Sequence, residues 1–183
     1  AHLEKIVQYN VQSSEKEKFD GVMLDIEPYI SDSWKENPEE YMDRYISCMK
    51  KGYKFTQKNH LRTAICIPRH YDNQGLTSGL EELIKETCDE VAVMNYSCGN
   101  EIEAIRTEAA LSEKYGKELH CILEFQEVGK HGLTENKTYR NKGIDNAKET
   151  WEKLQKEYKN INVTRDYHWS RPVREMLEEK NAD

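Results

Sequence analysis

Short apolar runs alternate with longer charged segments along almost the whole chain. The apolar runs are rich in Val, Ile, Leu and Cys and are bounded by polar or turn residues; they cover residues 21–26, 63–67, 91–95, 119–125 and, more weakly, 161–167. Runs of this length and composition are typical of strands that are buried on both faces of a parallel sheet. We therefore predict one strand in each run.

The charged segments between the runs carry apolar residues at helical spacing. One segment begins with Asn37 and Pro38, and Pro suits the first position of a helix. The positions that share a helix face are Tyr41, Tyr45, Cys48 and Met49 in this segment, Leu80, Leu83 and Ile84 in the next, Ile102, Ile105, Ala109 and Leu111 in the third, and Ala147, Trp151, Leu154 and Tyr158 in the fourth. Further helices are predicted around residues 3–7, before the first strand, and 173–177, after the last.

Strands that alternate with helices predict an α/β fold with a parallel sheet and right-handed crossovers. No linker or shift in composition divides the chain, so residues 1–183 are interpreted as a single domain or part of one. The order of elements fits the C-terminal five strand–helix units of a TIM-type (β/α)8 barrel, whose complete form has about 250 residues. An open flavodoxin-like sheet is the alternative, because the alternation alone does not distinguish the two folds.

Charge and cysteine content narrow the class of partner. The chain has 27 Lys and Arg residues against 34 Asp and Glu residues, a formal net charge of −7. This balance argues against nucleic acid or an anionic membrane surface, since both bind a basic face. No apolar run approaches the roughly 20 residues of a membrane-spanning helix. The 5 cysteines are scattered, without metal-ligand spacing, so we expect free thiols, no metal site and no cofactor.

The loops that follow the strands are longer than those that precede them. Residues 28–37, 68–78 and 126–141 follow strands, whereas residues 86–90 and 115–118 lead into them. In parallel α/β folds the active site lies at the carboxyl ends of the strands. We therefore expect the functional residues at that edge of the sheet.

The first apolar run ends with two carboxylates at alternate positions, Asp25 and Glu27. Side chains alternate along a strand, so both carboxylates point to the same face as Met23. Two neighbouring carboxylates in one pocket do not both ionise freely, so we expect the pKa of one of them to be raised, which suits a general acid near neutral pH. The alternative is a solvated strand end, or an acidic pair held by an arginine such as Arg69 or Arg165.

The segment from Asp20 and Gly21 through Asp25 to Glu27 resembles the D-G-x-D-x-D-x-E signature of the family-18 glycoside hydrolases, the chitinases and endo-β-N-acetylglucosaminidases. That signature lies on the fourth strand of their barrel. Met23 stands where the family has its first inward Asp. The resemblance implies that the predicted strands are strands four to eight of the barrel. The first three strands would then lie upstream, or a second chain would cover the open edge of the sheet.

Two later segments extend the resemblance. Met94-Asn95-Tyr96-Ser97 stands in the place of the family's M-x-Y-D, with Ser97 in place of the Asp. The family closes its sugar pocket with an aromatic residue, usually Trp, on the last strand, and Tyr167-His168-Trp169 ends the fifth run here.

The resemblance also implies a mechanism on glycans that contain N-acetylglucosamine. Glu27 would protonate the leaving glycosidic oxygen, while the 2-acetamido group of the substrate would attack the anomeric carbon. Asp25, helped by a hydrogen bond from Tyr96, would orient the acetamido group and stabilise the oxazolinium intermediate. Trp169 would form the apolar floor of the sugar site. An enzyme of this kind would be secreted or lie at the cell surface.

Further candidates for substrate contacts are Tyr29, close to Glu27, and Asn95, next to Tyr96. Arg69 follows the second strand and could hold polar groups of a substrate; an ordinary surface turn is the alternative. Glu124 lies inside the fourth apolar run, where a carboxylate is costly without a partner. For Glu124 we expect a place in the pocket or a pairing with Arg69, with an edge-exposed side chain as the alternative.

Three functions remain open from the sequence. The first is a retaining glycoside hydrolase of the mechanism above, with a carbohydrate substrate. The second is a barrel that binds glycan without cleaving it, with Met23 as the mark of lost catalysis. The third is a barrel hydrolase that uses Asp25, Glu27 and Glu124 on another substrate, for which an acetamido group has no importance.

Overall fold

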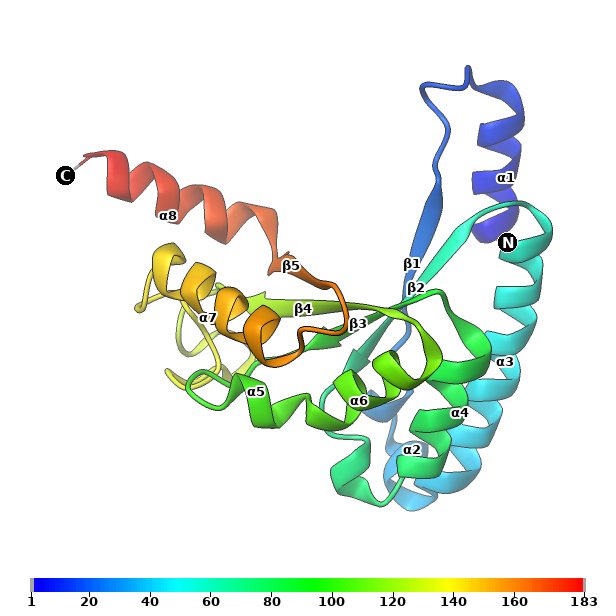
Figure 1. Cartoon of the computed structure of the whole chain (residues 1–183), viewed down its shortest axis with the longest axis horizontal. Coiled ribbons are helices and arrows are strands. Elements are labelled where there is room, and N and C mark those ends of the chain that lie inside the picture. The colour runs from blue at the N-terminus through cyan, green and yellow to red at the C-terminus, as the bar shows by residue number, and fades with distance from the viewer. Residues whose placement is uncertain (1, 183) are drawn as a thin grey trace.

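The computed structural model describes residues 2–182 and contains a parallel sheet whose strands lie in chain order from β1 to β5 (Figure 1). The strands are β1 (Gly21–Asp25), β2 (Arg62–Pro68), β3 (Glu90–Met94), β4 (Glu118–Glu124) and β5 (Val163–His168). Each predicted apolar run coincides with one of these strands. The predicted α/β fold with a parallel sheet is therefore confirmed.

The helices connect the strands as predicted, with two differences. They are α1 (His2–Gln12), α2 (Asp32–Glu36), α3 (Pro38–Lys58), α4 (Thr77–Thr87), α5 (Glu101–Ala104), α6 (Arg106–Tyr115), α7 (Ile144–Glu157) and α8 (Ser170–Ala182), with short 3-10 turns η1 (Pro28–Ile30), η2 (Asp72–Gln74) and η3 (Lys130–Gly132). The short helix α2 lies within a predicted loop, where the Ser31 hydroxyl accepts a hydrogen bond from the backbone N–H of Trp34. The predicted third helix is divided into α5 and α6 at Ile105, whose φ of −126° is not helical.

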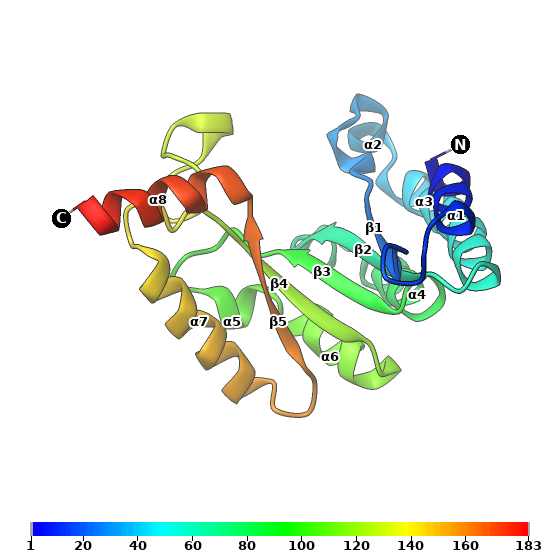
Figure 2. The same ribbon diagram turned by 90° about the horizontal axis from the view of Figure 1, so that it is seen from above.

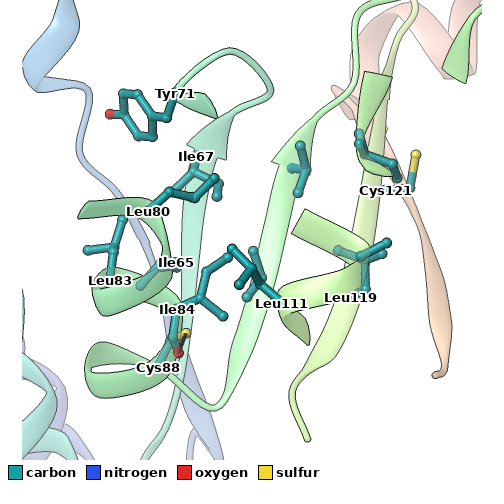
Figure 3. Close-up of a cluster of buried hydrophobic side chains, with 14 of the residues drawn as sticks. Ile65, Ile67, Tyr71, Leu80, Leu83, Ile84, Cys88, Leu111, Leu119 and Cys121 are labelled. Atoms are coloured by element: carbon teal, nitrogen blue, oxygen red, sulfur yellow. Dashed lines mark hydrogen bonds between the residues drawn. The ribbon is translucent and has the colours of Figure 1, made fainter. Parts of the chain in front are cut away.

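The crossover helices α3, α4, α6 and α7 lie on the same face of the sheet (Figure 2). Alternate side chains of the central strands, such as Ile65, Ile67 and Leu119, point to this face and are fully buried. Figure 3 shows them packed against Leu80 and other apolar side chains of the helices. Burial of each such side chain contributes about 1.5–3 kcal/mol, so this layer is the main source of stability.

The opposite face of the sheet carries smaller and more polar side chains. Cys66, Ala92 and Ile122 form a separate buried group there, with Tyr96 packed against it. The prediction that the strands are buried on both faces is wrong for the edge strand β1, where Met23 is 49% exposed. Cys66 and Ala92 are buried because they are small and neighbouring strands shield them, so their burial does not require a covering layer.

The order of the strands distinguishes this sheet from a flavodoxin-like one. In a flavodoxin-like sheet the order is 2-1-3-4-5 and helices cover both faces. Here each strand pairs with the next one in the chain, from β1 to β5. The alternative of a flavodoxin-like sheet therefore does not describe this chain.

Two further properties concern the described part of the chain as a whole. Among residues 2–182, no helix combines the length and the apolar composition that a membrane span requires. All five cysteines are free thiols, as expected, and Cys66, Cys88 and Cys121 are buried.

Candidate functional site

A hollow of about 1160 Å³ lies over the open face of the sheet, towards the carboxyl ends of the strands. Its lining includes the predicted site residues Asp25, Glu27, Tyr96, Glu124 and Trp169. These residues come from β1, β4 and the segments directly after β1, β3 and β5. The parallel register brings them to one edge because it aligns the carboxyl ends of neighbouring strands.

Alternation along β1 decides which of its side chains reach the hollow. Met23, Asp25 and Glu27 line it, whereas Leu24 packs against the core on the helix-covered face. Asp25 lies opposite Cys66 in the register with β2. The predicted orientation of the two carboxylates is therefore confirmed.

Glu27 is held by a neighbouring tyrosine. The hydroxyl of Tyr29 donates a hydrogen bond to the Glu27 carboxylate. The Tyr29 ring packs edge-on against His70, with 5.3 Å between ring centroids. Burial and the adjacent Glu27 carboxylate raise the pKa of Tyr29 far above its ordinary value, so Tyr29 remains a neutral donor. Tyr29 thus acts on the site through Glu27.

Buried Glu124 and partly exposed His168 form a pair at the carboxyl ends of β4 and β5. Glu124 Oε2 lies 2.8 Å from His168 Nδ1, and Glu124 Oε1 accepts hydrogen bonds of 2.8 Å from the backbone N–H groups of Phe125 and Gln126. The Glu124 side chain is only 2% exposed. Its partner is His168 and not Arg69.

The contact between Glu124 and His168 favours the ionised form of each partner. Burial acts to raise the pKa of Glu124, but the hydrogen bonds from His168 and the Gln126 backbone outweigh it, and the pKa lies below its ordinary value. The hydrogen bond that His168 donates to Glu124 raises the pKa of His168 above its ordinary value, against the effect of burial. Asp25 and Glu27 raise it further, which shows that their charges act on His168.

Two aromatic residues complete the site. Tyr96 packs against the His168 ring, with 5.8 Å between centroids and 34° between planes. Burial and the charge of Glu124 raise the pKa of Tyr96 far above its ordinary value, so its hydroxyl remains a neutral donor. Trp169 is 46% exposed, follows a cis peptide bond from His168, and offers an apolar surface to the hollow.

Three predicted substrate contacts, Tyr29, Asn95 and Arg69, are not among the residues that line the hollow. Asn95 is 1% exposed, and its amide donates to the Glu101 carbonyl at 2.9 Å and to Cys121 Sγ at 3.5 Å, on the helix-covered face. Its neighbour Tyr96 reaches the opposite face because side chains alternate. Arg69 lies on the turn after β2, where its charge, together with burial, lowers the pKa of His70.

Sequence reasoning missed several residues of the hollow. His168 had a usable signal, because a carboxylate such as Glu124 in a buried run needs a partner and a neighbouring strand ends in a histidine. Lys137 and Arg174 also line the hollow. They lie in a loop and in α8, and no local pattern assigns a loop or helix residue to a pocket formed by distant strands.

A second polar cluster lies at the amino end of the open face. Glu90, Glu118 and His120 offer ligand atoms within 4.8 Å of one another, which could hold a metal ion. Arg62, however, lies 2.6 Å from Glu90 and 3.4 Å from Glu118, and His120 also contacts Asp166 at 3.1 Å. The carboxylates are therefore already compensated by protein cations, and the cluster ties β2, β3, β4 and β5 together without an ion.

No protein-family model matches the chain, and neither a curated protein nor a solved structure matches it. The geometry of the hollow and the residues that line it are therefore the basis on which a function is inferred.

Proposed function

We propose that the chain is a glycoside hydrolase-like domain that acts on N-acetylglucosamine-containing glycans by substrate-assisted acid catalysis. One observation carries the proposal. Asp25, Glu27, Tyr96 and Trp169, the residues through which the sequence resembles the family-18 glycoside hydrolases, come from three separate strand ends and line one hollow. Their convergence supports the proposal, because the residues of one catalytic site must lie around one space.

The sheet supports a TIM-type barrel as the setting of this site. In such a barrel each strand pairs with the next one in the chain and the helices form an outer ring. The order β1 to β5 and the position of the crossover helices on one face agree with this arrangement. The free edges of β1 and β5 would pair with further strands in a complete barrel, because an exposed strand edge invites pairing.

The proposed chemistry assigns one role to each residue. Glu27 gives its proton to the glycosidic oxygen as that bond breaks. The carbonyl oxygen of the substrate's 2-acetamido group forms a bond to the anomeric carbon, and water later opens the resulting oxazolinium ion with retention of configuration. Asp25 stabilises the positive charge of this intermediate, Tyr96 donates a hydrogen bond to the acetamido group, and Trp169 packs against the sugar ring.

The hydrogen bonds of the site support these roles. The hydroxyl of Tyr29 restrains the Glu27 carboxyl group, and a fixed orientation is what proton transfer to a bound substrate requires. Tyr96 keeps its proton, so its hydroxyl is available as a donor.

Met23 favours a second candidate, a domain that binds glycan without cleaving it. Met23 lines the hollow. The family-18 glycoside hydrolases have an Asp at this position, and it shares charge with the residue that corresponds to Asp25. A thioether carries no charge, so Asp25 lacks this partner. This candidate predicts that the chain binds N-acetylglucosamine oligomers. Neither the unmodified chain nor Glu27→Gln would then cleave them.

Mass-spectrometric product analysis tests the proposal. The chain, Glu27→Gln and the control Glu149→Gln, which alters an exposed carboxylate of α7 outside the hollow, would each be incubated with β-linked N-acetylglucosamine oligomers, an N-glycan and deacetylated oligomers. We expect cleavage of the acetylated substrates by the chain and the control, reduced roughly 100-fold or more in Glu27→Gln, because general acid catalysis typically contributes that much.

The other outcomes identify the other functions. Binding of the oligomers without cleavage by any form would favour the non-catalytic candidate. Equal cleavage of acetylated and deacetylated oligomers would contradict substrate assistance and favour a barrel hydrolase of another kind. Neither binding nor cleavage would reject carbohydrate as the ligand.

A further inference from the structure

Cationic side chains gather at one side of the hollow, although the chain carries a net charge of −7. Lys137, from the loop between β4 and α7, and Arg174, from α8, both line the hollow, as Trp169 does. Both are exposed, and within residues 2–182 neither has an ion-pair partner. His131, from the same loop, lines the hollow as well.

His168 adds a side chain that the protein holds in place. Glu124, 2% exposed, contacts His168 Nδ1 at 2.8 Å and is itself fixed by two backbone N–H groups. Because Nδ1 contacts Glu124, Nε2 is the ring nitrogen left to face a ligand, and it donates a hydrogen bond when the ring carries both protons. In the described part of the chain Nε2 has no hydrogen-bond partner. A buried carboxylate thus orients a histidine that lines the hollow.

Asp25 and Glu27 lie at the other margin of the sheet, because they belong to β1 and the segment after it, whereas His168 belongs to β5. The other acidic residues that line the hollow, Glu124 and Asp166, lie on the β4–β5 side and contact His168 and His120. In the part of the chain that the structure describes, neither Asp25 nor Glu27 forms an ion pair with these cations. The unpaired carboxylates and the unpaired Lys137 and Arg174 therefore belong to different margins of the hollow.

We infer that the β5 side of the hollow is a subsite for an anionic group, a carboxylate or a sulfate ester, carried by the glycan next to the N-acetylglucosamine unit that Asp25 and Glu27 act on. This inference rests on the proposed function and specifies its substrate class. His168, Lys137 and Arg174 hold the anion through charge-assisted hydrogen bonds. A neutral oligomer would leave these cations without a partner. An acidic oligomer would supply a group of opposite charge on the β5 side of the hollow.

Binding to matched neutral and acidic oligomers tests this inference. The ligands are an N-acetylglucosamine tetramer, a tetramer of the same linkage in which alternate units carry a 3-O-lactyl carboxylate, and a 6-O-sulfated tetramer. Calorimetry would use the Glu27→Gln form, so that no ligand is consumed. We expect at least one acidic tetramer to bind roughly tenfold or more tightly than the neutral one, because a hydrogen bond to a charged group contributes about that much. The advantage should shrink as salt is added.

Two double variants with the same change in net charge assign the effect to its residues. Lys137→Gln/Arg174→Gln should remove the preference for the acidic tetramer and leave binding of the neutral one within about twofold. Lys130→Gln/Arg171→Gln is the control, because these cations pair with Glu127 and Glu175 and do not line this hollow. The four side chains are exposed, so neither variant should disturb the fold.

The failures of the inference and of the proposed function are distinguishable. Equal affinity for neutral and acidic tetramers would overturn the inference and leave the proposed function in place. An acidic preference that is equally reduced in both double variants would also overturn it, since it would reflect net charge alone. Absence of binding to all three tetramers would reject the proposed function and the inference with it. The acidic tetramer that binds more tightly identifies the group as a carboxylate or a sulfate.

Discussion

At the scale of single residues, burial of ionisable groups has consequences beyond the candidate site. Glu108 of α6 is fully buried, and neither of its carboxylate oxygens accepts a hydrogen bond. Burial raises its pKa from 4.5 to about 7. The protonated form is therefore the one that the folded protein favours, since a charged carboxylate without partners is costly in an apolar environment.

Glu108 should make the chain less stable as the pH rises from 4.5 to 7. In this window the unfolded state releases the proton of Glu108 while the folded state keeps it, so the free energy of unfolding falls by up to about 3 kcal/mol. We expect Glu108→Gln to flatten this slope, measured by urea unfolding at pH 5, 6 and 7. The control is Glu149→Gln. Identical slopes for Glu108→Gln and the unmodified chain would contradict the assignment.

The Glu124–His168 pair makes a second prediction at this scale. Glu124→Gln should lower the pKa of His168 towards its ordinary value of 6.5, because the hydrogen bond that His168 donates to the Glu124 carboxylate is the main cause of the increase. In the unmodified chain the pair's contribution to stability through His168 is present below pH 6.5 and is lost as the pH rises through the higher folded-state pKa. NMR titration of the histidine ring protons measures the pKa of His168 in the unmodified chain and in Glu124→Gln.

His120 is the internal reference for this titration. Its pKa is raised by the hydrogen bond to Asp166 and by Glu90, so Glu124→Gln should leave it unchanged. A pKa of His168 that does not move in the variant would show that Glu124 does not hold its charge, and would remove the support that the pair gives to the anionic subsite.

At the scale of elements, the contact between α3 and α4 depends on one glycine. A Cβ at Gly79 would lie 2.5 Å from Cγ of Met42, which is 1% exposed. We expect Gly79→Ala to destabilise the chain by about 1–3 kcal/mol, because a side chain forced into a packed core displaces its neighbours. Urea unfolding measures the change.

Gly52→Ala is the matched control within α3. No atom lies within 4 Å of the position that its Cβ would take. Alanine favours a helix over glycine by about 1 kcal/mol, so this variant should be slightly more stable than the unmodified chain. Stabilisation by both substitutions would show that the α3–α4 contact is looser than described.

At the scale of the whole molecule, burial is unequal across the sheet. Buried residues dominate β2, β3 and the second half of β4, whereas β1 contains no buried residue and α1 none either. Local opening requires less free energy where fewer apolar contacts are lost. Stability is therefore concentrated in the centre of the sheet, away from the β1 end of the hollow.

Hydrogen exchange followed by mass spectrometry should report this gradient. We expect slow exchange in β2 to β4 and exchange close to the unprotected rate in α1, with β1 and β5 between them because each pairs on one side only. Protection of α1 equal to that of β3 would contradict the unequal distribution of stability.

The sequence by itself determined the elements and part of the site. Helix and strand periodicities are local properties, so each apolar run became a strand and α3 begins at Pro38 as predicted. Alternation along β1 was enough to place Asp25 and Glu27 on one face. The same rule, applied to Asn95 beside Tyr96, already separates the two, because adjacent strand residues point in opposite directions.

Only the tertiary structure decided which face of the sheet the helices cover and which residues meet across strands. Apolar composition makes a strand suitable for burial, but it does not say what covers it, and so the exposed face of β1 was not predicted. The pairing of Glu124 with His168 depends on the register between β4 and β5. Register, and the presence of Lys137 and Arg174 in the lining of the hollow, arise from contacts between residues far apart in the chain, which local periodicity does not encode.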